Sequence, residues 1–327
     1  MNDRAPVVED WTSKHLIYSA PRSIIENLEL EQQPRYIQQY LRRNILFRRP
    51  IVGPIPRPIF PWREDTSGLQ RDWGIAAGAA YTVGVGNFPA KYVFNVNQAP
   101  SCTADYVVFT TSLNSTTATD IYAVNNLYVN SGGTGLCKPL TNPTVLWAYH
   151  IQSQGGSANT SPVISLAGDQ IAWVEDGGGK AVLHILKPYT EGADGTIAAP
   201  HTPTASASAT AYESCTPAAP TGTTSKACLL NLTFANGDDD AGDAAAISPS
   251  SPYYDYLGDL IVVGDDGGNL HEFTNVFKGT PTLPPAEVTT GGWPVAMTPA
   301  DTPASLASPV LDDTSGNVFV GDASGRM

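Results

Sequence analysis

Three segments of this chain repeat one pattern, and this repeat restricts the fold more than any other sequence feature. Aligned without gaps, they read SPVISLAGDQIAWVEDGGG from residue 161, SPYYDYLGDLIVVGDDGGN from residue 251 and SPVLDDTSGNVFVGDASGR from residue 308. An acid lies fourteen residues after each opening serine, and a glycine lies seventeen residues after it. The aligned positions are Ser161, Ser251 and Ser308, Glu175, Asp265 and Asp322, and Gly178, Gly268 and Gly325. Each unit is predicted to form a strand, a turn, a second strand and an acidic-glycine turn into a third strand.

Strand-like runs continue through the rest of the chain after Trp73. Examples are KYVFNV, DYVVFTTS, DIYAVNNLYV, TVLWAYHI, AVLHIL and LIVVGDD, which are β-branched or aromatic and are separated by Gly, Asn, Asp and Pro. With 30 glycines, 27 prolines and 15% charged residues, the composition also favours short strands joined by turns. No helical period separates these runs, which disfavours a βαβ enzyme fold. The predicted fold class of residues 72–327 is all-β.

The repeated units resemble the blades of quinoprotein-type (PQQ-like) β-propellers. The resemblance rests on VLWAYHI followed by SPVISLAGDQIAWVED, on GDLIVVGDDGGNLHEF and on SGNVFVGDASG. In that family a tryptophan strand precedes the Ser-Pro hairpin, and here Trp147 lies 14 residues before Ser161 and Trp293 lies 15 residues before Ser308. The wider run through DW, PAKY, APSCTADYVVF and IYAVNNLY is similar to secreted propeller-like proteins of soil bacteria. The resemblance covers about residues 72–190 and 248–327 and implies a β-propeller, although a fold does not imply a function.

The number of units bears on how complete the propeller is. Units begin near residues 99, 161, 251 and 308, and the last one stops after its second strand. Propeller blades have four strands, and a closed ring has typically about 4–8 blades. We therefore expect an incomplete propeller, with the chain a fragment of a longer protein. The alternative is that strands near the N-terminus complete the last blade.

Three segments depart from the blade pattern. Residues 22–49 have helix-like spacing interrupted by Pro34, so residues 1–49 are predicted to form a short helical N-terminal extension. Residues 50–71 are rich in proline and are predicted to be a linker. Residues 191–248 are rich in Ala, Thr, Ser and Pro, and they are predicted to form a low-complexity surface insertion that cannot order itself. Within it, only ACLLNLTF has strand character.

The charge distribution excludes one class of partner. The net charge is −13, with +3 on residues 1–71 and −16 on residues 72–327. The acidic bulk would repel a phosphate backbone, so nucleic-acid binding is not expected.

No apolar run approaches the roughly 20 residues of a membrane span. The N-terminal MNDRAPVVEDW lacks the layout of an export signal, yet four cysteines and many serines and threonines favour an extracellular or periplasmic location.

The cysteines are predicted to form disulfides rather than a metal or redox site. Cys102 and Cys137 bracket a hairpin, while Cys215 and Cys228 bracket a polar stretch, so sequential pairing is the simplest of the 3 connectivities. No CxxC spacing occurs, which argues against zinc and a redox dithiol. The adjacent-cysteine pair of some quinoprotein dehydrogenases is missing, which argues against quinone binding. No cofactor is therefore predicted.

Calcium is the one metal for which the sequence offers ligands, and the signal is weak. The run NGDDDAGD supplies Asp238, Asp240 and Asp243 as candidate oxygen ligands. The run lacks EF-hand spacing, so a solvated acidic loop is the alternative. The acids before the repeat glycines, at 265, 266 and 322, are interpreted as turn caps. The five histidines form no paired-ligand motif, and no nucleophile elbow or phosphate-binding loop is present.

Two functions of different class follow from these observations. The first is a non-catalytic extracellular binding or scaffold module that uses the loop faces of the propeller to hold a protein or glycan partner, with the tyrosines of SPYYDY as exposed contact residues. The alternative is a secreted hydrolase or quinone-dependent dehydrogenase with its site at the propeller channel. The first is favoured because every repeated residue has a structural explanation, whereas chemistry needs one site and a repeat offers many equivalent ones.

Overall fold

The fold was analysed in a computed structural model, which describes residues 75, 87–92, 100–111, 117–129, 133, 135–151, 158, 160–177, 180–235, 250–297, 304–312 and 315–326. The predicted N-terminal helical extension (1–49) and Pro-rich linker (50–71) lie outside the described residues. Gly178 and the calcium candidates Asp238, Asp240 and Asp243 lie outside them as well.

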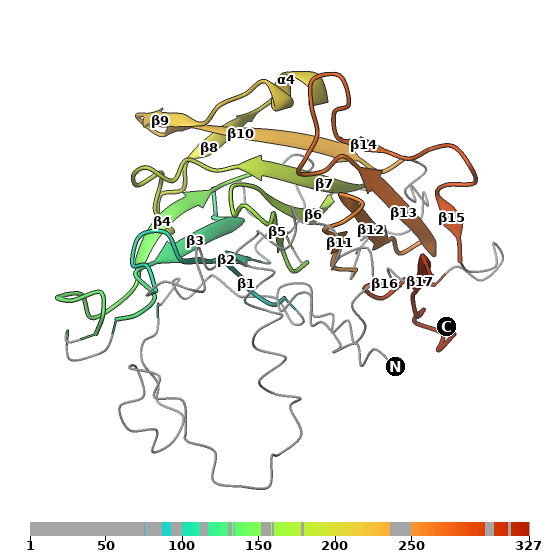
Figure 1. The fold of residues 1–327 in the computed structure, drawn as a ribbon, viewed down its shortest axis with the longest axis horizontal. Helices are drawn as coiled ribbons and strands as arrows, with labels where there is room; N and C mark the ends of the chain where they lie inside the picture. The colour runs from blue at the N-terminus through green and yellow to red at the C-terminus, as the bar shows by residue number, and fades with distance from the viewer. Residues whose placement is uncertain are drawn as a thin grey trace, which may run out of the picture.

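Four β-sheets follow one another along the described chain (Figure 1). Sheet 1 contains β1 (Ala90–Tyr92), β2 (Tyr106–Thr110), β3 (Ile121–Asn125) and β4 (Thr144–Tyr149). Sheet 2 contains β5 (Val163–Ile164), β6 (Ile171–Gly177), β7 (Lys180–Lys187), β8 (Thr202–Ala205), β9 (Ala218–Thr221) and β10 (Thr224–Thr233). Sheet 3 contains β11 (Tyr253–Asp255), β12 (Leu260–Gly264), β13 (Asn269–Thr274), β14 (Ala286–Glu287) and β15 (Val295–Ala296). Sheet 4 contains β16 (Val310–Asp312) and β17 (Asn317–Phe319).

The all-β prediction is confirmed for the described residues, where the labelled helix is the five-residue α4 (Ala209–Glu213). The sequence pattern of each strand matches the burial of its side chains. In β2, buried and half-buried side chains alternate. β7 lies between β6 and β10, and its apolar run is buried throughout Ala181–Leu186. A strand covered on both faces is expected to show such a continuous run. None of the four sheets closes on itself within the described residues, so the propeller remains a prediction.

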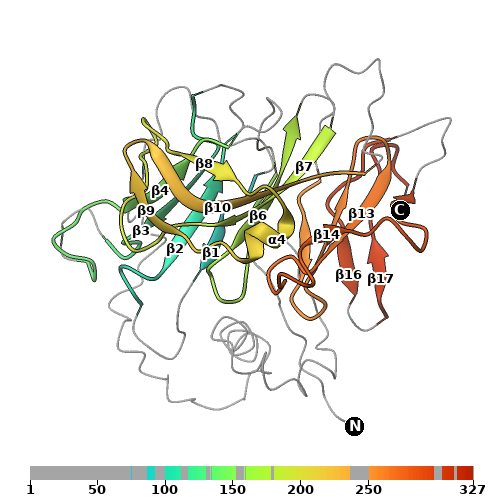
Figure 2. The ribbon, with the colours of Figure 1, turned by 90° about the horizontal axis from the view of Figure 1, so that it is seen from above.

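The first two strands of every sheet form an equivalent antiparallel hairpin. The matching registers are Ala90 with Val108, Val163 with Ala172, Tyr253 with Val262, and Val310 with Phe319. The first strands, β1, β5, β11 and β16, lie along the lower side of the sheets in Figure 1, and Figure 2 shows the sheets placed side by side. These registers make Phe88-Pro89 the counterpart of the repeated Ser-Pro. The first unit therefore begins at residue 88 and not near residue 99, because Phe88 occupies the position of the repeat serine.

The repeat serines connect neighbouring sheets through one recurring hydrogen bond. The N–H of Phe88 donates to Ser161 Oγ at 2.8 Å, the N–H of Ser161 donates to Ser251 Oγ at 2.9 Å, and the N–H of Ser251 donates to Ser308 Oγ at 2.9 Å. Each serine hydroxyl thus accepts from the backbone N–H of a residue that directly precedes a proline, at the start of the neighbouring sheet. We call these contacts the serine clamps.

Large apolar clusters fill the junctions between the sheets. Trp147 is fully buried and stacks on Tyr149 with ring centres 5.0 Å apart, and both belong to a cluster with Ile164 and Trp173 of sheet 2. Trp293 packs in the cluster that joins sheet 3 to sheet 4. Both repeat tryptophans therefore lie at sheet junctions, where burial of aromatic surface contributes most to stability.

The prediction that residues 191–248 cannot order themselves is wrong for the described part, 191–235. This part forms β8, α4, β9 and β10, and the long strand β10 lies along the upper side of sheet 2 in Figure 1. The strand-like ACLLNLTF falls within β10 and the residue that follows it. β10 pairs with β7 on one edge and with β8 on the other, so tertiary pairing and the Cys215–Cys228 bridge order a segment whose own composition is weakly apolar.

Candidate functional site

The candidate site is a hollow of about 280 Å³ at the end of β7, which we call the Lys187 hollow. It is lined by Asp169, Lys187, Pro188, Tyr189, Thr190, Glu191, Thr216 and Pro217. These residues come from the turn between β5 and β6, from the end of β7 with the loop that follows it, and from the segment after α4. The lining combines two carboxylates, an ammonium group, a phenol and two hydroxyls, so hydrogen-bond donors and acceptors face the same space.

Lys187 is held rigidly at the base of this site. It is the last residue of β7, where its backbone pairs with Cys228 of β10. Its ammonium nitrogen lies 4.2 Å from the centre of the Tyr212 ring, donates to the backbone carbonyl of Tyr212 at 3.1 Å and lies 3.6 Å from Glu213 Oε2. Burial raises the pKa of Glu213, and the neighbouring Lys187 lowers it. The cation–π contact and the ion pair fix the ammonium group in place.

The loop that carries Tyr189 is anchored to sheet 1. The N–H of Tyr189 donates to Tyr149 Oη at 3.3 Å, and that hydroxyl donates to Asp194 Oδ2 at 2.8 Å. The fully buried Asp194 also accepts from Ser225 Oγ at 2.6 Å and contacts His201 Nδ1 at 2.6 Å. Burial and the Asp194 carboxylate raise the pKa of Tyr149, so the phenol stays protonated and keeps donating. Asp194 is therefore the hub that holds the loop.

A disulfide and a tight turn fix the remaining walls. The predicted pairing of Cys215 with Cys228 is confirmed, and it places the adjacent Thr216 and Pro217 beside the end of β7. Asp169 lies in the turn between β5 and β6, where its Oδ1 accepts from Ser165 Oγ at 2.7 Å.

A glycine lets the same turn pack closely against sheet 1. Gly168 has φ +73°, and a Cβ added there would lie 2.2 Å from the Tyr92 ring. Only glycine fits this close approach.

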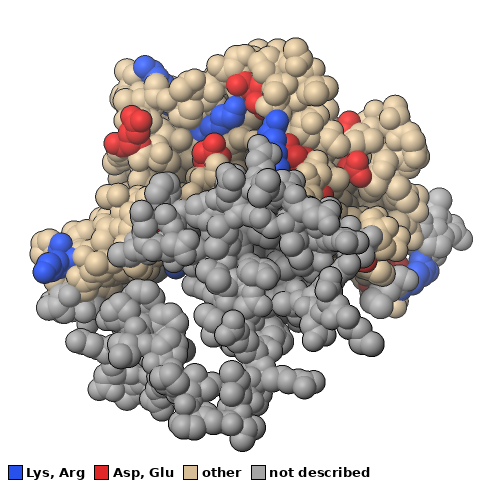
Figure 3. Space-filling view, viewed as in Figure 1, with Lys and Arg blue, Asp and Glu red and all other residues tan. Residues whose placement is uncertain are grey.

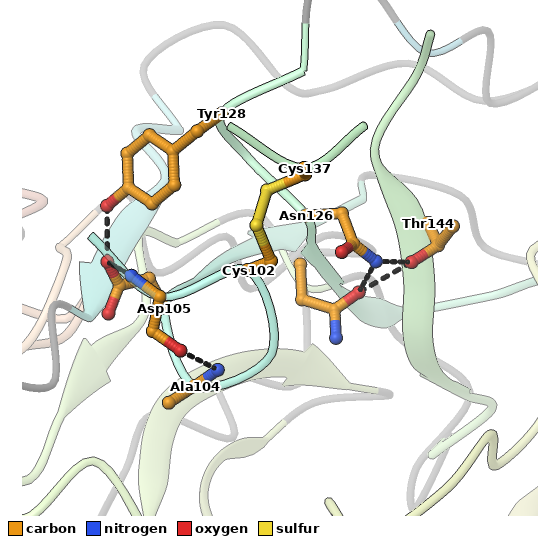
Figure 4. The surroundings of a disulfide bond; sticks show 9 residues. Cys102, Ala104, Asp105, Asn126, Tyr128, Cys137 and Thr144 are labelled. Carbon is orange, nitrogen blue, oxygen red and sulfur yellow. Dashed lines mark hydrogen bonds between the residues drawn. A yellow bond between two sulfur atoms is a disulfide. The ribbon is translucent and has the colours of Figure 1, made fainter. Parts of the chain in front are cut away.

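The second disulfide, Cys102–Cys137, is also confirmed and belongs to a structural corner of sheet 1 (Figure 4). Around it, the Tyr128 hydroxyl donates to Asp105, and Asn126 Nδ2 donates to Thr144 Oγ1 at 2.6 Å. Two disulfides are typical of proteins from oxidising compartments.

None of the helical segments in the described chain has the length and apolar character needed to cross a bilayer.

Sheets 2 and 3 contain equivalent buried pairs of an acid and a histidine. His184 Nε2 lies 2.7 Å from Glu175 Oε2, and His271 Nε2 lies 3.2 Å from Asp265 Oδ2. The two histidines are fully buried, and they occupy matching positions opposite the second strand. Burial lowers the pKa of His271, but its hydrogen bonds to Asp265 and Glu287 raise it above the usual 6.5. Because the pairs recur and are sealed from solvent, we interpret them as structural.

Asp120 is a buried carboxyl group beside His150. It lies before β3, where its Oδ2 accepts from the N–H of Ile151 at 2.5 Å and lies 3.1 Å from His150 Nδ1, while its Oδ1 is buried with no hydrogen-bond partner. Its pKa is raised from 3.8 to about 7, mainly by burial; the hydrogen bond from Ile151 lowers the pKa, the Glu175 charge raises it and His184 lowers it.

His150 also borders a second hollow, which lies beside Asn231 and has a volume of about 160 Å³. The lining of this hollow does not include Asp120.

The predicted contact residues of SPYYDY are not exposed, and this interpretation is wrong. Tyr253, Tyr254 and Tyr256 are 1–3% exposed, because Tyr254 and Tyr256 pack in the apolar cluster between sheets 2 and 3, and Tyr253 packs against Leu311 of sheet 4. The turn acids behave as caps: Asp265 Oδ1 accepts from the N–H of Asn269 at 2.6 Å, and Asp322 Oδ1 accepts from two following N–H groups. Gly268 and Gly325 adopt the positive φ values that these turns need.

Among the described residues, no group of three or more His, Cys, Asp or Glu side chains is arranged to hold a metal ion. The candidate functional residues that sequence reasoning missed are those of the Lys187 hollow. The run KPYTEG, from Lys187 to Gly192, was the available signal, because it places a cation, an aromatic ring and an acid directly after a predicted strand. Comparison with protein-family models and with curated proteins finds no match to this chain.

Proposed function

We propose that this chain is a non-catalytic extracellular binding module, built from PQQ-like propeller blades, that holds its partner at the Lys187 hollow. The blade arrangement is supported by the equivalent hairpins of the four sheets and by the serine clamps that relate each sheet to the next. The two disulfides support an extracellular or periplasmic location. No family match contributes to this proposal.

The observation that carries the proposal is the contrast between buried and accessible polar groups. The acids and histidines suited to proton transfer, such as Glu175 and His184, are sealed inside the sheets and hydrogen-bonded to each other. The Lys187 hollow instead presents the exposed carboxylates of Asp169 and Glu191 next to the half-buried Tyr189. Polar groups that converge around an aromatic ring on a rigid frame are typical of a binding site.

The second candidate function is a secreted hydrolase, and one observation favours it. Asp120 has a pKa of about 7, which suits a general acid or base at neutral pH. Its side chain is 5% exposed and bonds to the backbone of Ile151, so a substrate does not reach it in this conformation. The binding function is therefore the better supported of the two.

Binding and turnover assays on the full chain, produced under oxidising conditions, test the proposal. We expect saturable binding to at least one member of a panel of oligosaccharides and extracellular proteins, reduced by Tyr189→Ala and unchanged by Phe319→Ala, which removes an exposed aromatic ring from sheet 4. Hydrolysis of a polysaccharide or peptide panel that Asp120→Asn abolishes would establish the hydrolase instead. A quinone absorption band after reconstitution would establish the dehydrogenase.

A further inference from the structure

We propose that the Lys187 hollow binds a neutral, polyhydroxylated ligand, namely a sugar residue of a glycan. This inference rests on the proposed function, because it names the ligand class of the same site. It starts from the mixed polarity of the lining, which combines acceptors (Asp169, Glu191), a donor (Lys187) and groups that do both (Thr190, Thr216). Each sugar hydroxyl donates and accepts, so such a lining satisfies it in either role.

The charges of the hollow disfavour an anionic ligand. The carboxylates of Asp169 and Glu191 are exposed and repel an anion. The Lys187 ammonium offsets little of this repulsion, because it is held between the Tyr212 ring and Glu213. On the face shown in Figure 3, acidic and basic side chains are interspersed rather than gathered into a patch of one sign. A neutral ligand does not meet this repulsion.

Tyr189 supplies the apolar surface against which a sugar ring packs. The ring of Tyr189 is half-buried, and a Cβ added at Gly192 would lie 3.5 Å from its Cε1, so the glycine backbone supports one part of the ring. The loop is further held through Tyr149. Pro188 and Pro217 add flat apolar walls with little conformational freedom to lose. A fixed aromatic ring beside hydrogen-bonding groups matches the apolar C–H face and polar edge of a pyranose.

The size of the hollow limits how much of a glycan it holds. Its volume of about 280 Å³ is slightly smaller than that of typical small-molecule sites, which span about 300–1,000 Å³. One sugar ring fits better than several. The exposed Thr190 and Glu191 at the rim leave room for a chain to continue into solvent.

Titration of the purified full chain with hexasaccharides tests the ligand class. The probes are neutral cello-, manno-, xylo- and laminari-hexaose, anionic oligogalacturonate and cationic chitosan hexamer, measured by calorimetry at 150 mM salt. We expect at least one neutral probe to bind at least tenfold more tightly than the anionic probe. Tyr189→Ala should weaken that binding at least tenfold, Glu191→Gln should change it less than about threefold because the amide oxygen still accepts, and Phe319→Ala should leave it unchanged. Circular dichroism confirms that each variant is folded.

The outcomes separate this inference from the function on which it rests. Tighter binding of a charged probe, lost with Tyr189→Ala, would overturn the neutral ligand and keep the binding function. Neutral binding that survives Tyr189→Ala would overturn the assignment to this hollow. Absence of binding by every probe, together with turnover of any of them, would overturn both.

Discussion

The junctions between sheets and the outer part of sheet 2, residues 190–235, are held together in different ways. At the junctions the same contact recurs: a serine of one unit accepts from the backbone of the preceding unit, as with Ser161 and Ser251. In the outer part every contact occurs once, including the Cys215–Cys228 bridge and the Asp194 hub. Repetition therefore accounts for the architecture, and the unique contacts account for the site.

This difference divides the expected effects of substitution into two groups. Changes at a junction should alter the free energy of unfolding and leave ligand binding at the Lys187 hollow intact in the folded protein. Changes in the outer part should weaken binding even where their effect on stability is small. Four variants test this division, and their expected effects on stability decrease from the first to the last.

Asp120→Asn, at the junction of sheets 1 and 2, has the largest expected effect. Because the pKa of Asp120 is about 7 in the folded protein and 3.8 ordinarily, the folded state holds the proton more tightly. The resulting stability is fully present below about pH 4 and is lost as the pH rises through about 7. The variant, which stays neutral, should therefore be more stable than the wild type at pH 8, by at most about 4 kcal/mol.

Urea unfolding at pH 5 and pH 8 measures this effect. The advantage of the variant should shrink toward pH 5, and binding should not change. Glu175, His184 and His150 face Asp120 and are unchanged in the variant, so the difference between the two curves reports the loss of the Asp120 carboxyl group and of its interactions with them. Glu191→Gln, an exposed carboxylate, is the control. An advantage of the Asp120→Asn variant that does not depend on pH would contradict the prediction.

Replacing both Cys215 and Cys228 by alanine comes second and affects both properties. The bridge closes a loop of 13 residues, so its loss should destabilise the protein by roughly 3 kcal/mol. It should also weaken binding at least tenfold, because Thr216 and Pro217 lose their anchor. The matched control removes Cys102 and Cys137, which should destabilise to a similar degree without changing binding. Equal losses of binding in both variants would contradict the division.

Ser251→Ala tests a serine clamp alone. It removes the Oγ that accepts from the buried N–H of Ser161, which should cost about 1–3 kcal/mol. Binding should be unaffected at temperatures where the variant is folded. Ser315→Ala, at an exposed turn, should change stability by less than about 0.5 kcal/mol. Thermal unfolding measures the stability of each variant, and calorimetry measures its ligand binding. If Ser251→Ala destabilises the protein no more than Ser315→Ala does, the serine clamps contribute nothing to stability.

The sequence allowed the junctions to be predicted better than the outer part. Ser-Pro and the acid-glycine turn carry local information, since their backbone geometry depends on the residues themselves. The first unit was placed too late because Phe88 occupies the serine position. The segments TPTA and AAPT become β8 and β9 only through pairing with β10, and single-sequence propensity does not report such pairing.

The site was the least predictable feature, for a related reason. Asp169, Lys187 and Thr216 are distant in sequence, and only sheet pairing and a disulfide bring them together. The cysteine pairing itself was predictable, because sequential closure was the simplest connectivity. The tyrosines at 253 and 254 were predicted to lie on the surface, because nothing in the sequence indicates that β11 is buried on both faces.

Tyr149→Phe has the smallest expected effect on stability and separates the two regions most sharply. It removes one hydroxyl, which donates to Asp194 at 2.8 Å and accepts from the N–H of Tyr189 at 3.3 Å. The loss should cost about 1 kcal/mol of stability. Because the loop of Tyr189 then lacks its anchor to sheet 1, ligand affinity should fall several-fold. Tyr254→Phe loses a comparable buried hydrogen bond, to Asp259 at 2.7 Å, and should leave affinity unchanged. If both variants bind equally well, the hollow does not depend on its anchor, and rigidity of the Tyr189 loop is not what creates the site.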